Sequence, residues 1–145
     1  MNGFTAAVSR LRHLPRDARV MIPAFTFAAV PSAVVHADCE VVLVEVGDNY
    51  RVDMADFSAK LPDADAVMIS HMRGHTSDMD AIMDIARRHR LFVVEDCAEG
   101  FGTLYHGRHV GTFGDISTFS FFGNKTITTG EGGMVVSPDK TLIER

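Results

Sequence analysis

The sequence predicts an α/β protein of three layers, α/β/α, in which helices cover both faces of a mostly parallel β-sheet. Short runs of branched and aromatic residues alternate with longer stretches whose apolar residues recur at helical spacing. The short runs are continuously apolar, which is typical of parallel strands that are buried on both faces. The regular alternation of the two kinds of segment indicates repeated strand–helix–strand units.

Six segments have the composition of strands, because they are rich in branched and aromatic residues. In chain order, the expected strands are Arg19–Ile22, Glu40–Val46, Ala66–Ile69, Leu91–Glu95, Ser117–Phe121 and Gly133–Ser137. Their spacing leaves room for a helix in most of the connections between them.

Four segments have the apolar spacing of helices. They are Thr5–Leu14, Thr26–His36, Met54–Lys60 and Asp78–Arg90. The last is the best marked, because Asp78 is a residue type that caps helix N-termini. Arg87 and Arg88 lie near its other end, where the helix dipole favours cations.

The composition is that of one globular domain, with 145 residues of which 46% are hydrophobic. A net charge of -5 argues against a nucleic-acid partner, since such proteins usually carry a basic face. The apolar runs are far shorter than the roughly 20 residues that cross a bilayer, so we expect no membrane partner. Two cysteines, Cys39 and Cys97, are too few for a disulfide framework and favour a reduced, cytoplasmic protein.

Polar, aromatic or glycine-bearing segments lie at or just after the ends of four expected strands. They are Pro23–Phe27, Ser70–His75, Asp96–Glu99 and Ser120–Lys125. Open α/β sheets bind ligands at the carboxyl ends of their strands. We therefore expect these four segments to converge on one binding site.

The most specific pattern lies in the last third of the chain. Asp96 ends an apolar run, Ser120 precedes Lys125 by five residues, and the glycine-rich segment Thr129–Gly133 follows. In a pyridoxal phosphate (PLP) pocket, an acid keeps the ring nitrogen protonated, a hydroxyl binds the phosphate, and a lysine forms the Schiff base. The pattern therefore predicts a PLP-dependent aminotransferase.

Each of these three residues also has a plain structural explanation. Asp96 could cap the turn after its strand, Ser120 could be a buried strand hydroxyl, and Lys125 could be a surface lysine. Cys97 is expected to be a small buried residue rather than a nucleophile, because the neighbouring carboxylate raises the pKa of a thiol.

A metal site is a further alternative, suggested by His71 and His75 together with Asp78 and Asp80. Two histidines spaced in this way can bind zinc on a helix. Here Gly74 and the end of a strand interrupt that helix, and no cysteine or third histidine completes the ligand set. We therefore expect no metal.

These motifs resemble those of the DegT/DnrJ/EryC1/StrS sugar aminotransferases, which are fold-type-I PLP enzymes. The matching segments are Ile22–Phe27, Asp78–Asp80, Glu95–Glu99, Gly111–Asp115 and Phe119–Met134. The resemblance covers essentially the whole chain, and the last segment is most similar to the perosamine synthetase branch. It implies that residues 1–145 form part of a PLP-binding large domain. It also implies transfer of an amino group from glutamate to a nucleotide-linked 4-keto-6-deoxy sugar by a homodimer.

The resemblance also implies a role for each site residue. Lys125 is the Schiff-base lysine and the proton shuttle, and Asp96 pairs with the pyridinium nitrogen. Ser120 binds the phosphate, Phe27 lies on the ring face rather than Phe25, and Glu99 lies near the ring hydroxyl. Thr5 and Ala6 belong to a variant of the family's phosphate-binding helix start, where free backbone N–H groups favour an anion.

Two alternatives to this function remain open. The segment Gly3–Ala7 resembles the start of one helix, and Thr141–Arg145 resembles the first turn of another, so both ends look cut through an element. We therefore expect a fragment that lacks the extreme N-terminus and the carboxyl-terminal domain, and such a fragment could be inactive. Some relatives instead dehydrate the sugar, with histidine in place of the lysine. Lys125 argues against that second alternative.

Overall fold

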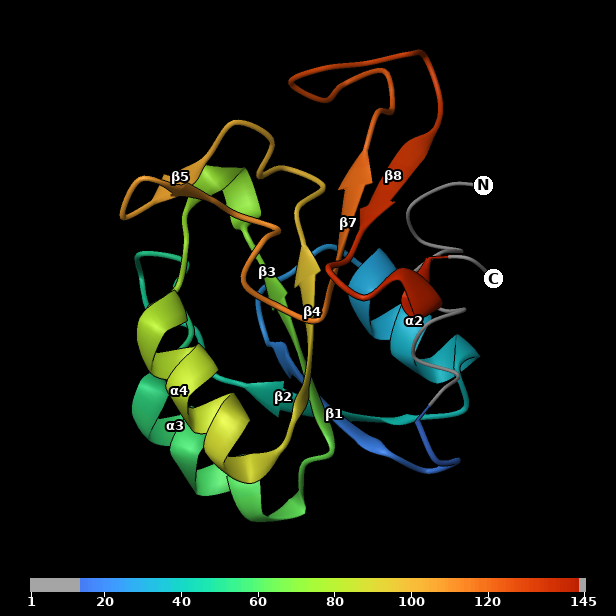
Figure 1. The fold of residues 1–145 in the computed structure, drawn as a ribbon. Coiled ribbons are helices and arrows are strands. Elements are labelled where there is room, and N and C mark those ends of the chain that lie inside the picture. The colour runs from blue at the N-terminus through green and yellow to red at the C-terminus, as the bar shows by residue number, and fades with distance from the viewer. Residues whose placement is uncertain (1–13, 144–145) are drawn as a thin grey trace.

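The computed structural model describes residues 14–143, and it has the expected α/β architecture (Figure 1). The strands of the main sheet are β1 (Arg19–Pro23), β2 (Glu40–Val44), β3 (Ala66–Ser70), β4 (Phe92–Asp96), β7 (Ile116–Ser120) and β8 (Gly133–Val136). The strand order is β2-β1-β3-β4-β7-β8, with β8 antiparallel to β7 and every other pair parallel.

Helices cover both faces of this sheet. They are α2 (Ala29–His36), α3 (Met54–Lys60) and α4 (Met79–His89), with short 3-10 turns at Leu61–Asp63, Met72–Gly74 and Lys140–Leu142. Helix α2 lies on one face, while α3 and α4 lie side by side on the other (Figure 1). The predicted three-layer arrangement is therefore confirmed.

The central strands β1, β3 and β4 each contribute to two cores, because successive side chains of a strand point to opposite faces. On one face, Val20 and Ile22 of β1 pack in a buried cluster with Val34 of α2. On the other face, Met21 belongs to a second cluster that contains the fully buried ring of Phe57 from α3. This double burial explains why the strands are apolar without alternation.

Two elements differ from their predicted bounds by more than one residue at an end. Helix α2 begins at Ala29 rather than Thr26. Thr26 lies before the helix, and its hydroxyl forms a 2.8 Å hydrogen bond with Ser70 Oγ. Strand β2 ends at Val44, and Val46 forms an isolated antiparallel bridge with Val52 in place of a longer ladder.

The boundaries of α4 match the end signals in the sequence. The Asp78 carboxylate caps the helix by accepting a 3.1 Å hydrogen bond from the Ala81 N–H. Arg90 ends the helix in the left-handed region, with φ of 57°. The expected helix Thr5–Leu14 lies outside the described residues except for Leu14.

A two-stranded hairpin was absent from the prediction. Strands β5 (Leu104–Tyr105) and β6 (Arg108–His109) have two residues each, which is too short for a periodic signal. The Tyr105 hydroxyl donates a 3.0 Å hydrogen bond to Asp78 Oδ1, so the hairpin is attached to the start of α4.

The three helices of the described segment are short, and α4 is the longest at eleven residues. Within residues 14–143, none is long and apolar enough to cross a membrane.

Replacement of Gly111 by alanine should destabilise the protein strongly. Gly111 has φ of +84°, and an added Cβ would lie 2.5 Å from Phe119 Cζ and 2.9 Å from Cys97 Sγ. We expect Gly111→Ala to lower the free energy of unfolding by about 2 kcal/mol or more, measured by urea denaturation. Gly107→Ala is the matched control, because Gly107 has φ of +80° but no atom within 4 Å of the added Cβ. Equal losses for the two variants would contradict this packing argument.

Candidate active site

The carboxyl ends of β3, β4 and β7 border a pocket of about 800 Å³. The pocket brings together all five of the predicted site residues that fall in the described part of the chain: Phe27, Asp96, Glu99, Ser120 and Lys125. Thr5 and Ala6 lie outside the described residues. The four segments that follow the strands therefore meet at one pocket, as the sequence predicted.

Asp96 is held at the end of β4 by two hydrogen-bond donors. Its Oδ1 accepts a 3.0 Å bond from the Ala98 N–H, and its Oδ2 accepts a 3.3 Å bond from the Ser70 hydroxyl. Burial raises the pKa of the Asp96 carboxyl above its ordinary value. A cationic partner in the pocket would stabilise its charged form, because a nearby opposite charge offsets the loss of solvation.

Lys125 and Glu99 form the polar side of the pocket. Lys125 Nζ lies 3.9 Å from Glu99 Oε1, and the lysine side chain is only 20% exposed. The other carboxylate oxygen of Glu99 accepts a 2.8 Å hydrogen bond from the backbone N–H of Arg73. The backbone of the loop after β3 therefore holds the acid that faces the lysine.

Ser120 and Phe27 offer a hydroxyl and an aromatic ring to the same space. Ser120 Oγ accepts a 3.4 Å bond from the Phe122 N–H, which leaves the hydroxyl hydrogen to donate elsewhere. Phe27 lines the pocket and is 68% exposed, so its ring can contact a planar ligand. Phe25 does not line this pocket.

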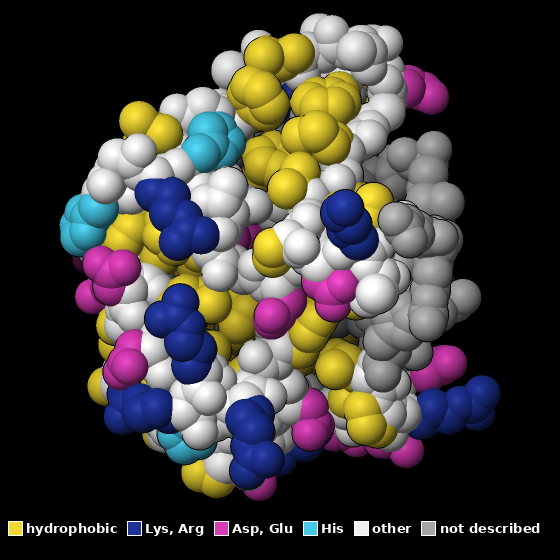
Figure 2. All heavy atoms as spheres, viewed as in Figure 1, with side chains coloured by type: hydrophobic (Ala, Val, Ile, Leu, Met, Phe, Trp, Pro, Cys, Tyr) yellow, Lys and Arg dark blue, Asp and Glu magenta, His cyan; other side chains and the backbone are white. Residues whose placement is uncertain are grey.

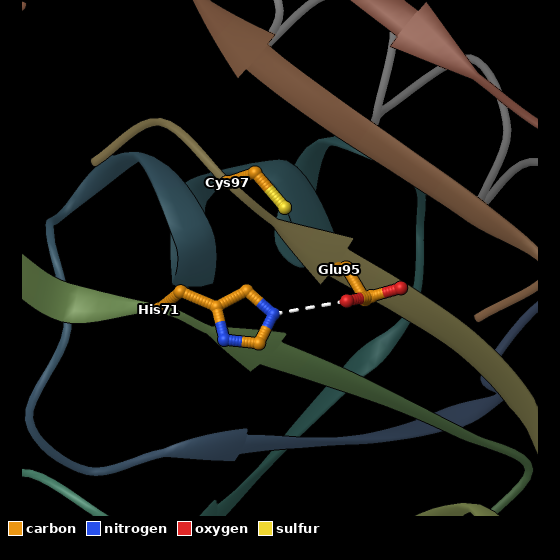
Figure 3. A group of neighbouring side chains, drawn as sticks. All are labelled: His71, Glu95 and Cys97. Atoms are coloured by element: carbon orange, nitrogen blue, oxygen red, sulfur yellow. Dashed lines mark hydrogen bonds and ion pairs between the residues drawn. The ribbon is translucent and has the colours of Figure 1, made fainter. Parts of the chain in front are cut away.

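Glu95 has a structural role that the sequence analysis missed. This fully buried carboxylate accepts 2.7 Å hydrogen bonds from the backbone N–H groups of Gly111, Phe113 and Gly114. A fourth bond, of 3.0 Å, comes from His71 Nε2 (Figure 3). Burial alone would raise the pKa of Glu95, but the hydrogen bonds outweigh burial and hold this pKa below its ordinary value. A charged residue inside an apolar strand was the available signal, since a buried charge needs partners.

His71 connects the Glu95 network with the pocket. Its backbone N–H donates a 3.0 Å bond to the Asp96 carbonyl, and the residue lines the pocket. With Nε2 donating to Glu95, a neutral ring leaves Nδ1 without a proton. This Nδ1 atom is buried and has no hydrogen-bond partner within the described segment. These bonds hold His71, the residue just after β3, beside Asp96, the last residue of β4.

His71, Glu95 and Cys97 form a group whose potential metal-ligand atoms lie within 4.8 Å of one another (Figure 3). Both oxygens of Glu95 are already used by the donors described above. Burial, followed by the charges of Glu95 and Asp96, raises the pKa of the Cys97 thiol. Because a metal binds the thiolate, this group is poorly suited to hold an ion. Cys97 is buried, as expected of a packing residue.

The comparison with known sequences agrees with this geometry. A profile of the DegT/DnrJ/EryC1/StrS aminotransferase family matches residues 2–145. The GDP-perosamine synthase of Escherichia coli O157:H7 is 48% identical over 128 residues, which are 87% of this chain and 35% of that protein. The GDP-perosamine synthase of Caulobacter vibrioides is 43% identical over 146 residues, covering 97% of this chain and 39% of that protein. The chain thus spans little more than a third of these relatives.

Solved structures share this fold over nearly the whole chain. DesV of S. venezuelae, in complex with a ketimine intermediate, has a TM-score of 0.92 and 34% identity over 99% of this chain and 40% of that chain. The aminotransferase from Psychrobacter cryohalolentis has a TM-score of 0.91 and 34% identity over 97% of this chain and 37% of that chain. These likenesses confirm the predicted fold class.

Replacement of Glu95 by glutamine should destabilise the protein by about 3 kcal/mol or more at neutral pH. The carboxamide would place N–H hydrogens against backbone N–H donors that need an acceptor. The free energy of unfolding, from urea denaturation, tests this expectation. Glu45→Gln is the control, because Glu45 is exposed and should change stability by no more than about 0.5 kcal/mol. A loss of that small size for Glu95→Gln would contradict the proposed role of the network.

The contribution of Glu95 should also depend on pH in a defined direction. Its pKa is lower in the folded protein than in the unfolded chain, where glutamate has a pKa of about 4.3. The stabilisation is therefore fully present above that value and is lost as pH falls through the folded-state pKa. We expect the stability difference between the unaltered protein and Glu95→Gln to be constant near neutral pH and to shrink in acid. A difference that grows on acidification would contradict the sign of this pKa shift.

Proposed function

Because the chain belongs to the DegT/DnrJ/EryC1/StrS aminotransferase family, we propose that the protein containing it is a PLP-dependent sugar aminotransferase. It would transfer an amino group from glutamate to the 4-keto carbon of a nucleotide-linked 4-keto-6-deoxy sugar. The observation that carries this proposal is the presence of Asp96, Ser120 and Lys125 in one pocket.

The residues of the pocket fit PLP. When bound, this cofactor supplies an electron sink for the carbanion that forms at the substrate carbon. The carboxylate of Asp96 would accept the N–H of the ring nitrogen, because a cation there offsets the desolvation of the acid. The Ser120 hydroxyl would donate to the phosphate, and Phe27 would pack on the ring face.

Lys125 would transfer the proton of the reacting carbon, and Glu99 would stabilise the protonated lysine. Lys125 Nζ would hold the cofactor covalently and would carry a proton to and from the reacting carbon after its release. Glu99, 3.9 Å away, would stabilise the protonated amine and lie near the ring hydroxyl. Its orientation is supported by the hydrogen bond from the Arg73 backbone.

We further propose that residues 1–145 are part of a PLP-binding large domain in a longer, cytoplasmic protein that acts as a homodimer. The proposal of a longer protein is supported by the share of the named relatives that the chain covers. The proposal of a homodimer is supported by an exposed apolar surface around β7 and the loop that follows it, where Figure 2 shows hydrophobic side chains gathered. Phe122 and Ile127 of that loop are 55% and 47% exposed. A second subunit would cover this surface.

Incubation with PLP followed by borohydride reduction should label Lys125 in the full-length protein, as mapped by peptide mass spectrometry. Lys125→Ala should lose the label and reduce amino transfer by at least about a thousandfold, because the covalent attachment and the proton carrier are both removed. Lys140→Ala, which changes an exposed lysine outside the pocket, should keep both.

The product identifies the reaction. With nitrogen-labelled glutamate and a GDP-linked 4-keto-6-deoxy sugar, the label should appear on the sugar. Loss of water from the sugar without incorporation of nitrogen would assign the protein to the dehydratase class instead. Labelling spread over surface lysines, or transfer that survives Lys125→Ala, would contradict the role of Lys125.

A further inference from the structure

Four side chains outside the pocket form a cluster that the proposed chemistry does not use. We call it the aromatic shelf: Phe25, Tyr50, Arg73 and His75. The Phe25 and Tyr50 rings have centroids 5.2 Å apart, and the Tyr50 and His75 rings are 5.6 Å apart. Arg73 Cζ lies 5.8 Å from the centroid of the Tyr50 ring. The members come from the segments after β1, β2 and β3, whose carboxyl ends share one edge of the sheet.

The shelf is open to a ligand. Phe25 is 48% exposed, Arg73 and His75 are exposed, and Tyr50 is half-buried. The Arg73 guanidinium has no ion pair with a carboxylate in the part of the chain that the structure describes. The exposed side chain of Phe25, beside a guanidinium that has no carboxylate partner among residues 14–143, suits a ligand with a planar base and an anionic group. Bases stack on aromatic side chains, and guanidinium groups bind phosphate.

The shelf is also the immediate neighbour of the pocket. The backbone N–H of Arg73 donates to Glu99 Oε2, and Glu99 Oε1 faces Lys125 Nζ. Met72 and Phe27 line the pocket, whereas Arg73 and Phe25, close to them in the chain, do not. A ligand that extends from Lys125 past Glu99 would therefore reach the shelf.

Two residues of the shelf have an unusual backbone conformation. Tyr50 and Arg73 both have positive φ, of 61° and 51°, although neither is glycine. Such conformations are uncommon for bulky residues and persist where the surrounding structure holds them. Backbone hydrogen bonds support both turns, since the Tyr50 N–H donates to the Gly47 carbonyl and the Gly74 N–H donates to the His71 carbonyl.

We propose that the aromatic shelf binds the nucleoside diphosphate part of the sugar nucleotide. The base stacks on Phe25 and Tyr50, and the diphosphate lies against Arg73 and His75. This inference rests on the proposed function, in which the sugar end of the same molecule reaches Lys125.

The test compares guanosine diphosphate and guanosine as probes in the full-length protein, with dissociation constants from calorimetry. Tyr50→Ala should weaken both probes by about tenfold or more, because it removes a stacking surface that both share. Arg73→Gln should weaken guanosine diphosphate but not guanosine, since only the former carries phosphates. Tyr50→Phe keeps the ring and should bind both probes as the unaltered protein does.

Steady-state kinetics gives a second readout. The KM for the sugar nucleotide should rise by about tenfold or more in Tyr50→Ala, and kcat should change less than KM. Phe25→Ala is a second variant from a different loop, should Tyr50→Ala fail to fold. Leu104→Ala is the control, because Leu104 is an exposed apolar residue on the β5–β6 hairpin and belongs to neither the pocket nor the shelf.

The outcomes separate this inference from the proposed function. Conversion of the bound cofactor by glutamate in the unaltered protein tests the aminotransferase proposal and does not involve a nucleotide. If that conversion occurs but Tyr50→Ala and Phe25→Ala leave guanosine diphosphate binding unchanged, the shelf inference is wrong. Altered subunit association in these variants, with unchanged nucleotide binding, would overturn it in favour of a subunit contact.

Discussion

The structure depends on the buried carboxylate of Glu95. A charge near the carboxyl end of a central strand carries a large desolvation cost when it is buried, and this cost must be offset by donors from elsewhere in the chain. Three backbone N–H groups from residues 111–114 and the ring of His71 provide them. To make these bonds, the loop before β7 must close against β4, and β3 must keep its register beside it. One interaction thereby fixes three neighbouring strands at the end where the pocket forms.

The pocket combines a residue of the sheet, Asp96, with a residue of a loop, Lys125. Asp96 is on β4, one residue after Glu95, and its carbonyl accepts from the His71 backbone. Lys125 comes from the long connection between β7 and β8, which extends beyond the sheet (Figure 1). The acid is therefore set by the sheet, while the position of the lysine depends on a loop whose apolar side chains lie at the surface (Figure 2).

The sequence alone was sufficient for the fold class, the strands of the main sheet and the described helices, because each has a local signal, and the parallel topology then predicted that the site residues meet. Asp78 marked the start of α4, and the segments after the strands shared one edge through parallel topology. The Glu95 network could not be derived in the same way, since its donors lie 16 to 24 residues away and their approach depends on tertiary packing. The β5–β6 hairpin is too short to leave a periodic pattern. The aromatic shelf joins three loops that have no regularity in sequence.

The hydrogen bonds of Glu95 do not involve Phe25 or Tyr50, and this affects how related sequences can change. Phe25 and Tyr50 make no contact with Glu95 that constrains their identity, because its four donors all come from other segments. Substitutions at Phe25 and Tyr50 can therefore accumulate without loss of the hydrogen bonds that Glu95 accepts. A lineage with this arrangement can change what it recognises while its chemical machinery stays intact.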